Sequence, residues 1–432
     1  MIKRSLLSIS QNDTSTLDQV FELIQKFIKL YEPAQDMNIG TLKTFFKKKT
    51  PEEKEEWEKK IFPQMFSLIR KTPELFPNKI SLLVQGRAQK ITLTKEQCAC
   101  LMSHMFMCTT ISQQQHQKKL PASFNFAELY SSSLFSNDHI KLEKLKCLAN
   151  YFKRIFTNCP DYKIIFERLA FNEAYSIDQW KDSQQKLLNL EIRPTGKIED
   201  VAQEAIEVDF ANKFLGGGVI KKGTAQEEIM FITSPETLIG VLFSEVMLDS
   251  EAILIQGTEI YCKYKGYLSN FTYDGDFQDT RPVRKDGVLE RAIVAIDALN
   301  FRRYPDINQF SEGPILRELN KAFIGFSGNL EAQKKIATGK WGCGDFHGNV
   351  QLKFLIQWLA SSMAGRDMIF YSFQDVKDLK HAEKIVELYK GREVGTLIAL
   401  ILSWCEQMSK KKDDLFTFLI NRKLNNNTVS KL

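Results

Sequence analysis

The stretch of sequence that decides the fold is residues 208–228, VDFANKFLGGGVIKKGTAQEE. It starts within a short apolar run, residues 206–210, of the kind that forms a buried strand. The glycines Gly216-Gly217-Gly218 follow, where the backbone can approach a ligand closely and turn its N–H groups toward an anion. Gln226-Glu227-Glu228 then begins an apolar helix. A strand, a glycine turn and a helix in this order predict an α/β unit with a ligand crevice beyond the end of the strand.

Each half of this segment also has a simpler explanation. Three glycines are more often a flexible turn than a phosphate cradle, and their spacing matches neither the Rossmann nor the P-loop motif. Acids at the start of a helix complement its dipole without any further role. In the functional interpretation, the glycines and the acids border one crevice, where one carboxylate holds sugar hydroxyls and the other transfers protons. A glutamate acts as an acid near neutral pH only if its pKa is raised, which burial and a neighbouring negative charge both do.

A second glycine-rich loop lies at residues 338–348, TGKWGCGDFHG. It precedes a helix that we expect to begin at Val350. The N-terminus of a helix attracts phosphate because its N–H groups have no partner within the helix. Two glycine loops in one α/β unit would therefore suit a diphosphate, although neither loop is decisive alone.

The chain after Pro194 alternates short apolar runs with amphipathic segments. This pattern predicts a mostly parallel or mixed sheet that is covered by helices on both faces. We expect strands at residues 206–210, 253–255, 293–296 and 368–373. We expect helices at residues 236–247, 350–363 and 382–389. The polar insertion at residues 274–291 is expected to be an exposed loop.

The chain before residue 160 has the pattern of a helical domain. Thr50-Pro51-Glu52-Glu53 is a strong helix start, and Thr94-Lys95-Glu96-Gln97 is a capping box. Residues 142–156 carry apolar side chains at helical spacing. Because no motif here indicates chemistry, we predict an all-helical accessory domain at residues 1–160 and an α/β catalytic domain at residues 161–432.

Composition gives no evidence for a metal site, a disulfide framework or a membrane span. The 432 residues carry a net charge of +6, which suits an anionic ligand but equally a protein with no charged partner. The eight cysteines include no C-x-x-C pair and there are five histidines, so we expect buried reduced thiols and no metal site. No run reaches the roughly 18 apolar residues that a membrane span requires.

The segment at residues 208–228 resembles the signature of the poly(ADP-ribose) glycohydrolases, three glycines followed by Gln-Glu-Glu. Further motifs occur in the order that this family has them: Gly257-Thr258-Glu259, Ala295-Ile296-Asp297-Ala298-Leu299, Trp341-Gly342-Cys343-Gly344 and Tyr371-Ser372-Phe373. The resemblance covers roughly residues 80–410. It implies a macrodomain-like mixed sheet flanked by helices, preceded by a helical accessory domain of the eukaryotic type.

The resemblance also implies roles for particular residues. Glu228 would be the catalytic acid and base, and Glu227 would orient the ribose beside it. Asp209 and Asn212 would shape and bind the terminal ribose site. The other residues expected to bind the substrate are Gly216, Gly217, Gly218 and Gln226, Glu199 and Tyr267 in contact with or stacked on the ligand, Phe373 on the adenine side, and the backbone of Gly342, Cys343, Gly344, Asp345 and Phe346 at the diphosphate. Asp345 departs from what a diphosphate loop would favour, and we expect its side chain to point outward.

The implied reaction is hydrolysis of the ribose–ribose bonds of poly(ADP-ribose), mainly from the polymer end, with release of ADP-ribose. Glu228 would protonate the leaving oxygen and then deprotonate water, without a metal or cofactor. The partners would be the polymer and poly(ADP-ribosyl)ated proteins, with no direct contact to DNA or a membrane, and the protein would be a monomer. The alternatives are a hydrolase of mono-ADP-ribosylated proteins and a non-catalytic macrodomain that binds ADP-ribose, which should lack the Gln-Glu-Glu element.

The expected location is the nucleus or the cytoplasm. The printed sequence closes on Ser430-Lys431-Leu432, which matches the peroxisomal address, so the peroxisome is the alternative. The match could also be coincidence, because these residues are common and the preceding tail is rich in asparagine.

Overall fold

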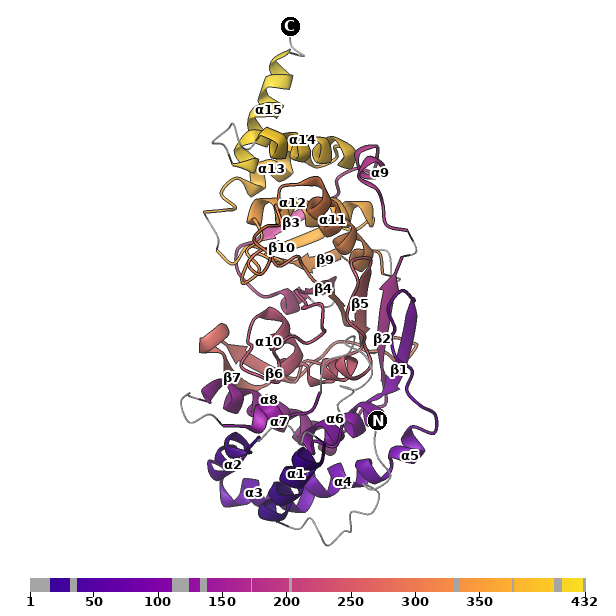
Figure 1. Cartoon of the computed structure of the whole chain (residues 1–432), viewed down its shortest axis with the longest axis vertical. Coiled ribbons are helices and arrows are strands. Elements are labelled where there is room, and N and C mark those ends of the chain that lie inside the picture. Colours follow the sequence, from indigo (N-terminus) through magenta and orange to yellow (C-terminus); the bar gives the residue numbers. More distant parts are fainter. Residues whose placement is uncertain are drawn as a thin grey trace.

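The computed structural model describes residues 16–31, 37–110, 124–132, 138–171, 173–201, 204–328, 335–374, 377–407 and 414–429. The molecule is elongated, with N-terminal helices at one end, a large sheet in the middle and C-terminal helices at the other end (Figure 1). Ser430-Lys431-Leu432 lies outside the described residues, so the peroxisomal address stays a prediction. Among the helices that the structure describes, none combines the length and the apolar character needed to cross a bilayer.

One mixed sheet of eight strands forms the centre of the molecule, in the order β1-β2-β5-β8-β4-β9-β10-β3. The strands β1, β2, β5 and β8 are antiparallel to their neighbours in this order, whereas β8, β4, β9, β10 and β3 run parallel to one another. The bounds are β1 Gln89–Thr94, β2 Lys163–Ala170, β3 Leu190–Arg193, β4 Ala205–Asp209, β5 Glu251–Gln256, β8 Ala292–Ala295, β9 Lys335–Thr338 and β10 Met368–Tyr371. The mixed sheet predicted for the second half of the chain is confirmed.

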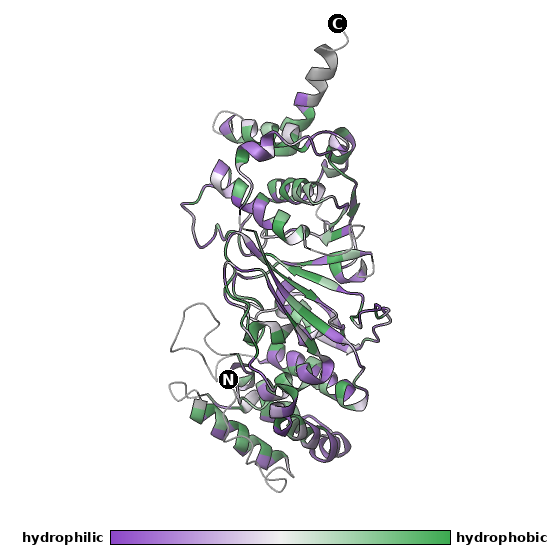
Figure 2. Cartoon of the chain, turned by 90° about the vertical axis from the view of Figure 1, so that its right-hand side faces the viewer, coloured by the Kyte–Doolittle hydropathy of each residue, from purple (hydrophilic) through white to green (hydrophobic). Residues whose placement is uncertain are grey.

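The central strands are apolar on both faces because both faces are covered. Alternate residues of β5 pack into two different cores: Ile253 and Ile255 join the helical N-terminal part, while Ala252 and Leu254 face the helices on the other side. Figure 2 shows these strands largely in green, the colour of hydrophobic residues. The accessory helices thus share a hydrophobic core with one face of the sheet.

In the second half of the chain, α10 and η5 pack in the core that the accessory helices share, whereas α11 to α15 cover the opposite face and the far end of the molecule. The described helices there are α9 Ile177–Lys181, η4 Ile198–Val201, α10 Gln226–Thr233, η5 Pro235–Leu242, η6 Leu268–Asn270, α11 Glu312–Phe326, α12 Val350–Met363, α13 Ala382–Tyr389, α14 Val394–Gln407 and α15 Leu415–Val429. The helices predicted at residues 350–363 and 382–389 are confirmed. The helix predicted at residues 236–247 is wrong in type and length, because this segment forms a short 3-10 helix, η5.

The N-terminal part is helical, as expected. It contains α1 Leu17–Tyr31, α2 Gly40–Lys47, α3 Pro51–Glu56, the π-helix η3 Trp57–Ile61, α4 Phe62–Arg70, α5 Thr72–Leu75, α6 Lys95–Phe106, α7 Ala127–Tyr130 and α8 His139–Thr157. Both predicted helix starts are confirmed, since Thr50 and Thr94 each form a capping box with the residue three positions later.

One element departs from the all-helical description of residues 1–160. Strand β1 pairs antiparallel with β2 along its whole length and closes one edge of the sheet. Its alternation of exposed and buried residues fits an edge strand that packs on one face. The division of the chain at residue 160 therefore stays a prediction, and β1 connects the two parts across it.

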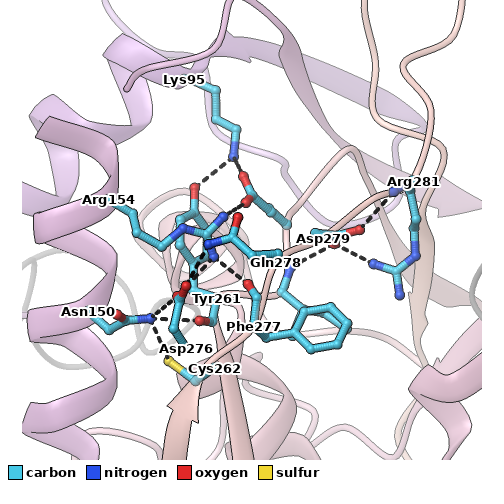
Figure 3. A network of polar contacts seen from close by, with 12 residues as sticks. Lys95, Asn150, Arg154, Tyr261, Cys262, Asp276, Phe277, Gln278, Asp279 and Arg281 are labelled. Carbon is cyan, nitrogen blue, oxygen red and sulfur yellow. Dashed lines mark hydrogen bonds and ion pairs between the residues drawn. The ribbon is translucent and has the colours of Figure 1, made fainter. Parts of the chain in front are cut away.

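A buried polar network joins the two parts (Figure 3). The Nζ of Lys95, on α6, is paired with the carboxylates of Glu236 and Glu259 and donates to the Tyr261 hydroxyl at 2.8 Å. Arg154, on α8, is paired with Glu259 and donates to the carbonyl of Phe277 at 2.5 Å. Because the two cations share an acid, the helices are held to the sheet domain in one arrangement.

The polar insertion is not simply an exposed loop. Its first residues belong to β7 Thr272–Asp276, which pairs with β6 Cys262–Lys265. Asp279, Arg281 and Arg291 within it are buried, with Arg281 paired with Asp279. Arg291 forms a bidentate pair with Glu207 on β4, at 2.9 and 2.7 Å. The sequence showed charged residues and indicated solvent, whereas their pairing allows them to lie inside.

Candidate active site

A cavity of about 720 Å³ opens where three parallel strands end. Phe210 follows β4, the loop from Lys340 to Phe346 follows β9, and Phe373 follows β10. This is the place where open α/β sheets hold their ligands, and the volume suits a ligand of nucleotide size. Of the predicted site residues, those that line the cavity are Glu199, Gln226, Tyr267, Gly342, Cys343, Gly344, Asp345, Phe346 and Phe373.

Helix α10 is fastened to the end of β4 by the side chain of Gln226. Its Oε1 accepts from the N–H of Phe210 at 2.8 Å, and its Nε2 donates to the carbonyl of Val208 at 3.0 Å. The amide completes the hydrogen bonding of a strand end that has no further strand to pair with. The role of Gln226 in this structure is thus to place the start of α10, and with it the two glutamates, against the cavity.

Glu227 is buried, with 4% of its surface exposed, and its carboxylate is held by the glycine segment. Its Oε2 accepts from the N–H of Asn212 at 2.9 Å and its Oε1 from the N–H of Gly216 at 2.7 Å. Burial raises the pKa of Glu227 well above its ordinary value, and the negative charges of Asp209 and Glu228 raise it further. The two N–H groups oppose this shift.

Glu228 is partly exposed and is held by both ends of the loop that precedes α10. Its Oε1 accepts from the N–H of Gly218 at 2.9 Å, and its Oε2 accepts from the N–H of Ala225 at 2.8 Å. Both acids are therefore fixed by backbone amides, which leaves the remaining lone pairs of each carboxylate for other donors.

The glycine triplet is folded tightly around these acids. Gly217 has a φ of +48°, and a Cβ there would lie 2.6 Å from Glu227 Oε2 and 2.8 Å from Glu228 Oε1. Its own N–H donates to the carbonyl of Phe214 at 3.2 Å. The three N–H groups thus hold two carboxylates and a carbonyl of the protein, rather than pointing toward an external anion.

Asp209, the last residue of β4, lies beside this pair. It is fully buried, and neither of its carboxylate oxygens has a hydrogen-bond partner among the described residues. Burial, together with the charge of Glu228, raises the pKa of Asp209 well above its ordinary value. Asp209 and Glu227 are thus two buried acids beside Glu228 whose protonated state is favoured by burial and by the negative charges of their neighbours.

Asp209, Asn212, the three glycines and the two glutamates are not part of the cavity lining itself. They lie next to it, connected through Gln226 and Ala225, which do line it. The Oδ1 of Asn212 accepts from the N–H of Phe214 at 3.0 Å and so shapes the turn that carries the glycines.

The second glycine loop is built differently. Trp341 is buried beneath it and donates from Nε1 to the carbonyl of Ile296 at 2.9 Å, which anchors the loop to the end of β8. The N–H of Cys343 donates to the carbonyl of Lys340 at 3.1 Å. In the part of the chain that the structure describes, the amides of Gly342, Gly344, Asp345 and Phe346 donate to no acceptor. They are the N–H groups that remain for an anion.

The phosphate site expected at the N-terminus of α12 stays a prediction. The side chain of Asn349 caps α12 by accepting from the N–H of Leu352 at 2.9 Å. This cap satisfies one of the unpaired N–H groups at the start of α12, and the loop before the helix carries further donors that have no acceptor among the described residues. Asp345 points outward as expected, since its carboxylate is three-quarters exposed and is paired with Arg302.

Two exposed aromatic side chains flank the cavity. Tyr267 is 53% exposed and Phe373 is 45% exposed, so neither is a core residue. The strand predicted at residues 368–373 ends at Tyr371, because Phe373 has a left-handed φ of +52°. That turn directs the chain out of the sheet and leaves the ring at the cavity.

Several residues at the site were not anticipated from the sequence. Lys197 and Lys340 bring positive charge to the lining. Tyr264 also lines the cavity and donates from its hydroxyl, at 2.7 Å, to the predicted residue Glu199, whose pKa is raised by burial. Lys144, on α8, reaches the glycine loop from the accessory helices. Of these residues, only Lys144 could have been predicted to be buried, because it lies on the same helix face as the apolar residues Leu148 and Tyr151.

The described residues contain no group of three or more histidine, cysteine or acidic side chains that could hold a metal ion. All eight cysteines are free thiols, five of them buried. The site therefore consists of acids, backbone amides, aromatic rings and two lysines.

Comparison with known families identifies the class of protein. A model described as "Poly (ADP-ribose) glycohydrolase (PARG), Macro domain fold" matches residues 177–380, and one described as "Poly (ADP-ribose) glycohydrolase (PARG), helical domain" matches residues 49–168. The chain thus combines a macrodomain with a helical domain, as the resemblance implied.

Curated relatives agree with these matches over most of the chain. The chain is 29% identical to poly(ADP-ribose) glycohydrolase 1 of Arabidopsis thaliana, over 85% of this chain and 81% of the relative. It is 31% identical to probable poly(ADP-ribose) glycohydrolase 2 of Arabidopsis thaliana, over 77% of this chain and 72% of the relative. It is 30% identical to poly(ADP-ribose) glycohydrolase 2 of Caenorhabditis elegans, over 88% of this chain and 77% of the relative. The chain therefore belongs to the poly(ADP-ribose) glycohydrolase family.

Proposed function

We propose that this chain hydrolyses the ribose–ribose O-glycosidic bonds of poly(ADP-ribose), mainly from the end of the polymer, and releases ADP-ribose. The observation that carries the proposal is the pair of glutamates at the start of α10, each held by backbone N–H groups beside the cavity. A macrodomain that only binds ADP-ribose has no need for two clamped carboxylates in a cluster of acids.

The ligand would occupy the cavity in one direction. The adenine would lie between Tyr267 and Phe373. The diphosphate oxygens would accept hydrogen bonds from the N–H groups of Gly344, Asp345 and Phe346. This order brings the terminal ribose to α10, where the carboxylate of Glu227 can accept from the ribose hydroxyls with its remaining lone pairs. Asp209 and Asn212 would shape this end of the site.

Glu228 would act as general acid and then as general base. It would protonate the leaving ribose oxygen while the anomeric carbon develops oxocarbenium character, and then take a proton from the attacking water. Its partial exposure leaves a path for that water, whereas the buried Glu227 stays with the sugar. The diphosphate of the substrate could stabilise the developing cation.

The decisive experiment compares the wild-type chain with Glu228→Gln on purified poly(ADP-ribose). We expect release of ADP-ribose to fall by about 10²–10⁴-fold, the usual contribution of general acid–base catalysis. Binding of ADP-ribose, measured by calorimetry, should change little, because the amide keeps the shape of the side chain. Turnover at the wild-type rate in this variant would contradict the assignment.

The products and substrates distinguish the finer possibilities. Free ADP-ribose without shortened oligomers at early times would support cleavage from the end, and early oligomers would show internal cleavage. A protein that carries a single ADP-ribose tests the alternative of a mono-ADP-ribose hydrolase.

We further propose that the chain acts as a monomer on polymer-modified proteins without contacting DNA. Light scattering would test the oligomeric state, and a DNA-binding assay would test the second point.

For the location we propose the nucleus or the cytoplasm, with the peroxisome as the alternative. A fluorescent fusion at the N-terminus, with and without Ser430-Lys431-Leu432, distinguishes them.

A further inference from the structure

One buried cation connects the accessory helices to the loop that carries the glycines. Lys144 lies on α8 and is fully buried. Its Nζ donates to the carbonyls of Val219 at 2.7 Å and Lys221 at 3.0 Å, and also to the carbonyl of Gly223. An ammonium group has three N–H donors and no acceptor, so these three carbonyls use all of its hydrogen-bonding capacity.

The three carbonyls belong to the loop whose two ends hold Glu228. Gly218 is the first residue of this loop and Ala225 is the last. The N–H of each donates to one oxygen of the Glu228 carboxylate. Within the loop, the N–H groups of Lys221 and Gly223 both donate to the carbonyl of Gly218, at 2.9 and 3.2 Å. Lys144 thus fixes the middle of a compact turn that encloses Glu228.

The loop also touches the carboxylate directly. A Cβ at Gly223 would lie 2.7 Å from Glu228 Oε1, so the backbone of this residue packs against the acid. Any shift of the loop by a fraction of an ångström would therefore move Glu228 or break its hydrogen bonds. Displacements of this size at a reacting group are costly for catalysis.

The other contacts between this loop and the helical part are weaker. Lys221 lies 3.4 Å from Glu128, and Lys222 lies 3.7 Å from Asp138, but both lysines are largely exposed. Exposed ion pairs contribute little because water and salt screen them. Lys144 differs from these ion pairs because it is fully buried and bonds to three carbonyls of the loop, whose residues Val219 and Ile220 also pack in the core shared with the accessory helices.

We propose that Lys144 is a positioning residue, through which the accessory helices hold the loop at residues 218–225 in the conformation that presents Glu228 to the substrate. The inference rests on the proposed role of Glu228 in poly(ADP-ribose) hydrolysis. It assigns the helical part a direct share in building the catalytic site, beyond sharing a core with the sheet.

The charge of Lys144 adds a pH dependence that a purely structural residue would not have. The pKa of Lys144 is lowered from 10.5 to about 7, mainly by burial; the charges of Glu228 and Cys147 oppose this shift and that of Lys141 adds to it. Below pH 7 the ammonium makes all three hydrogen bonds. Above it, the neutral amine has only two donors and turns a lone pair toward a carbonyl, so the loop should loosen as the pH rises.

The test uses the full chain with Lys144→Met, which keeps an unbranched side chain one atom shorter than lysine and removes its charge. We expect kcat on poly(ADP-ribose) to fall by about 10²-fold, while the affinity for ADP-ribose changes by less than about threefold. If Lys144 holds the loop, the kcat of the wild-type chain should decrease above pH 7 as the ammonium loses its proton. This decrease should be absent in Lys144→Met. Lys146→Met is the matched control, because Lys146 lies on the same helix with its side chain 44% exposed.

Two outcomes would overturn the inference. In one, Lys144→Met keeps the wild-type kcat and pH profile. In the other, kcat, ADP-ribose affinity and melting temperature fall together, which would indicate a general structural role. If the methionine variant does not fold, Lys144→Ala with added propylammonium decides: recovery of turnover by the cation supports the inference, and no recovery overturns it.

The failure of this inference is distinguishable from failure of the proposed function. If the wild-type chain releases ADP-ribose and Glu228→Gln does not, the proposed function holds whatever Lys144 does. If the wild-type chain is inactive on the polymer, the proposed function fails first.

Discussion

The two glycine loops of this protein have similar compositions and opposite uses. In the first, the N–H groups of Gly216, Gly217 and Gly218 are engaged with Glu227, Phe214 and Glu228. In the second, four amides between Gly342 and Phe346 have no acceptor among the described residues. One loop holds the protein's own acids in place, while the other is open to the anion of a ligand.

The comparison shows that glycine content alone does not indicate phosphate binding. What matters is where the N–H groups point, and in the first loop the chain itself supplies the negative charge. The first loop should therefore control the chemical step, and the second should control binding. Substitutions in the two loops should separate kcat from affinity.

Among substitutions in and around the two glycine loops, the largest effect is expected from Gly217→Ala. The added Cβ would collide with both carboxylates, and the left-handed φ adds roughly 1–2 kcal/mol of backbone strain. We expect kcat on poly(ADP-ribose) to fall by about 10²-fold, because Glu228 must move. Steady-state kinetics with a thermal melt would measure both consequences.

Gly344→Ala is the matched control in the second loop. A Cβ at Gly344 meets nothing within 4 Å, and its φ is not in the left-handed region. We expect its melting temperature to equal that of the wild type. If Gly217→Ala and Gly344→Ala lost kcat to the same extent, the assignment of the chemical step to the first loop and of binding to the second would be wrong.

A smaller effect is expected from Phe373→Ala, on the binding side of the site. The substitution removes the stacking of the exposed ring on the adenine, which is worth roughly 1–3 kcal/mol and corresponds to a decrease in ADP-ribose affinity of roughly 5- to 150-fold. Because the side chain is not part of the core, the melting temperature should not change. Calorimetry with ADP-ribose measures the effect, and an unchanged affinity would place the adenine elsewhere.

The smallest effect is expected from Asp345→Asn, which removes a negative charge next to the free amides. Its ion pair with Arg302 is exposed, so stability should stay the same. We expect ADP-ribose to bind about two- to fivefold more tightly at low salt, with the gain lost at high salt. Weaker binding would mean that Asp345 helps to hold the ligand, contrary to its outward orientation.

Local signals predicted a large part of the fold. The capping boxes at Thr50 and Thr94 depend on residues three positions apart, and both are confirmed. Helices α12 and α13 have the predicted bounds, because periodic apolar residues and adjacent breakers mark their ends. The predictions failed where distant residues decide: Arg291 is buried because Glu207, 84 positions away, neutralises it.

The sequence by itself determined the order of strand, glycines and acids, and the family to which that order belongs. Such a motif can be recognised because its parts lie within about twenty residues of each other. Only the tertiary structure decided what each part contacts. The glycines turned inward to hold Glu227 and Glu228, Gln226 became an anchor to β4, and a lysine 75 positions from Val219 closed the loop. A hydrogen bond depends on distances and directions in space, and for residues so far apart these exist only once the sheet and the accessory helices have packed together.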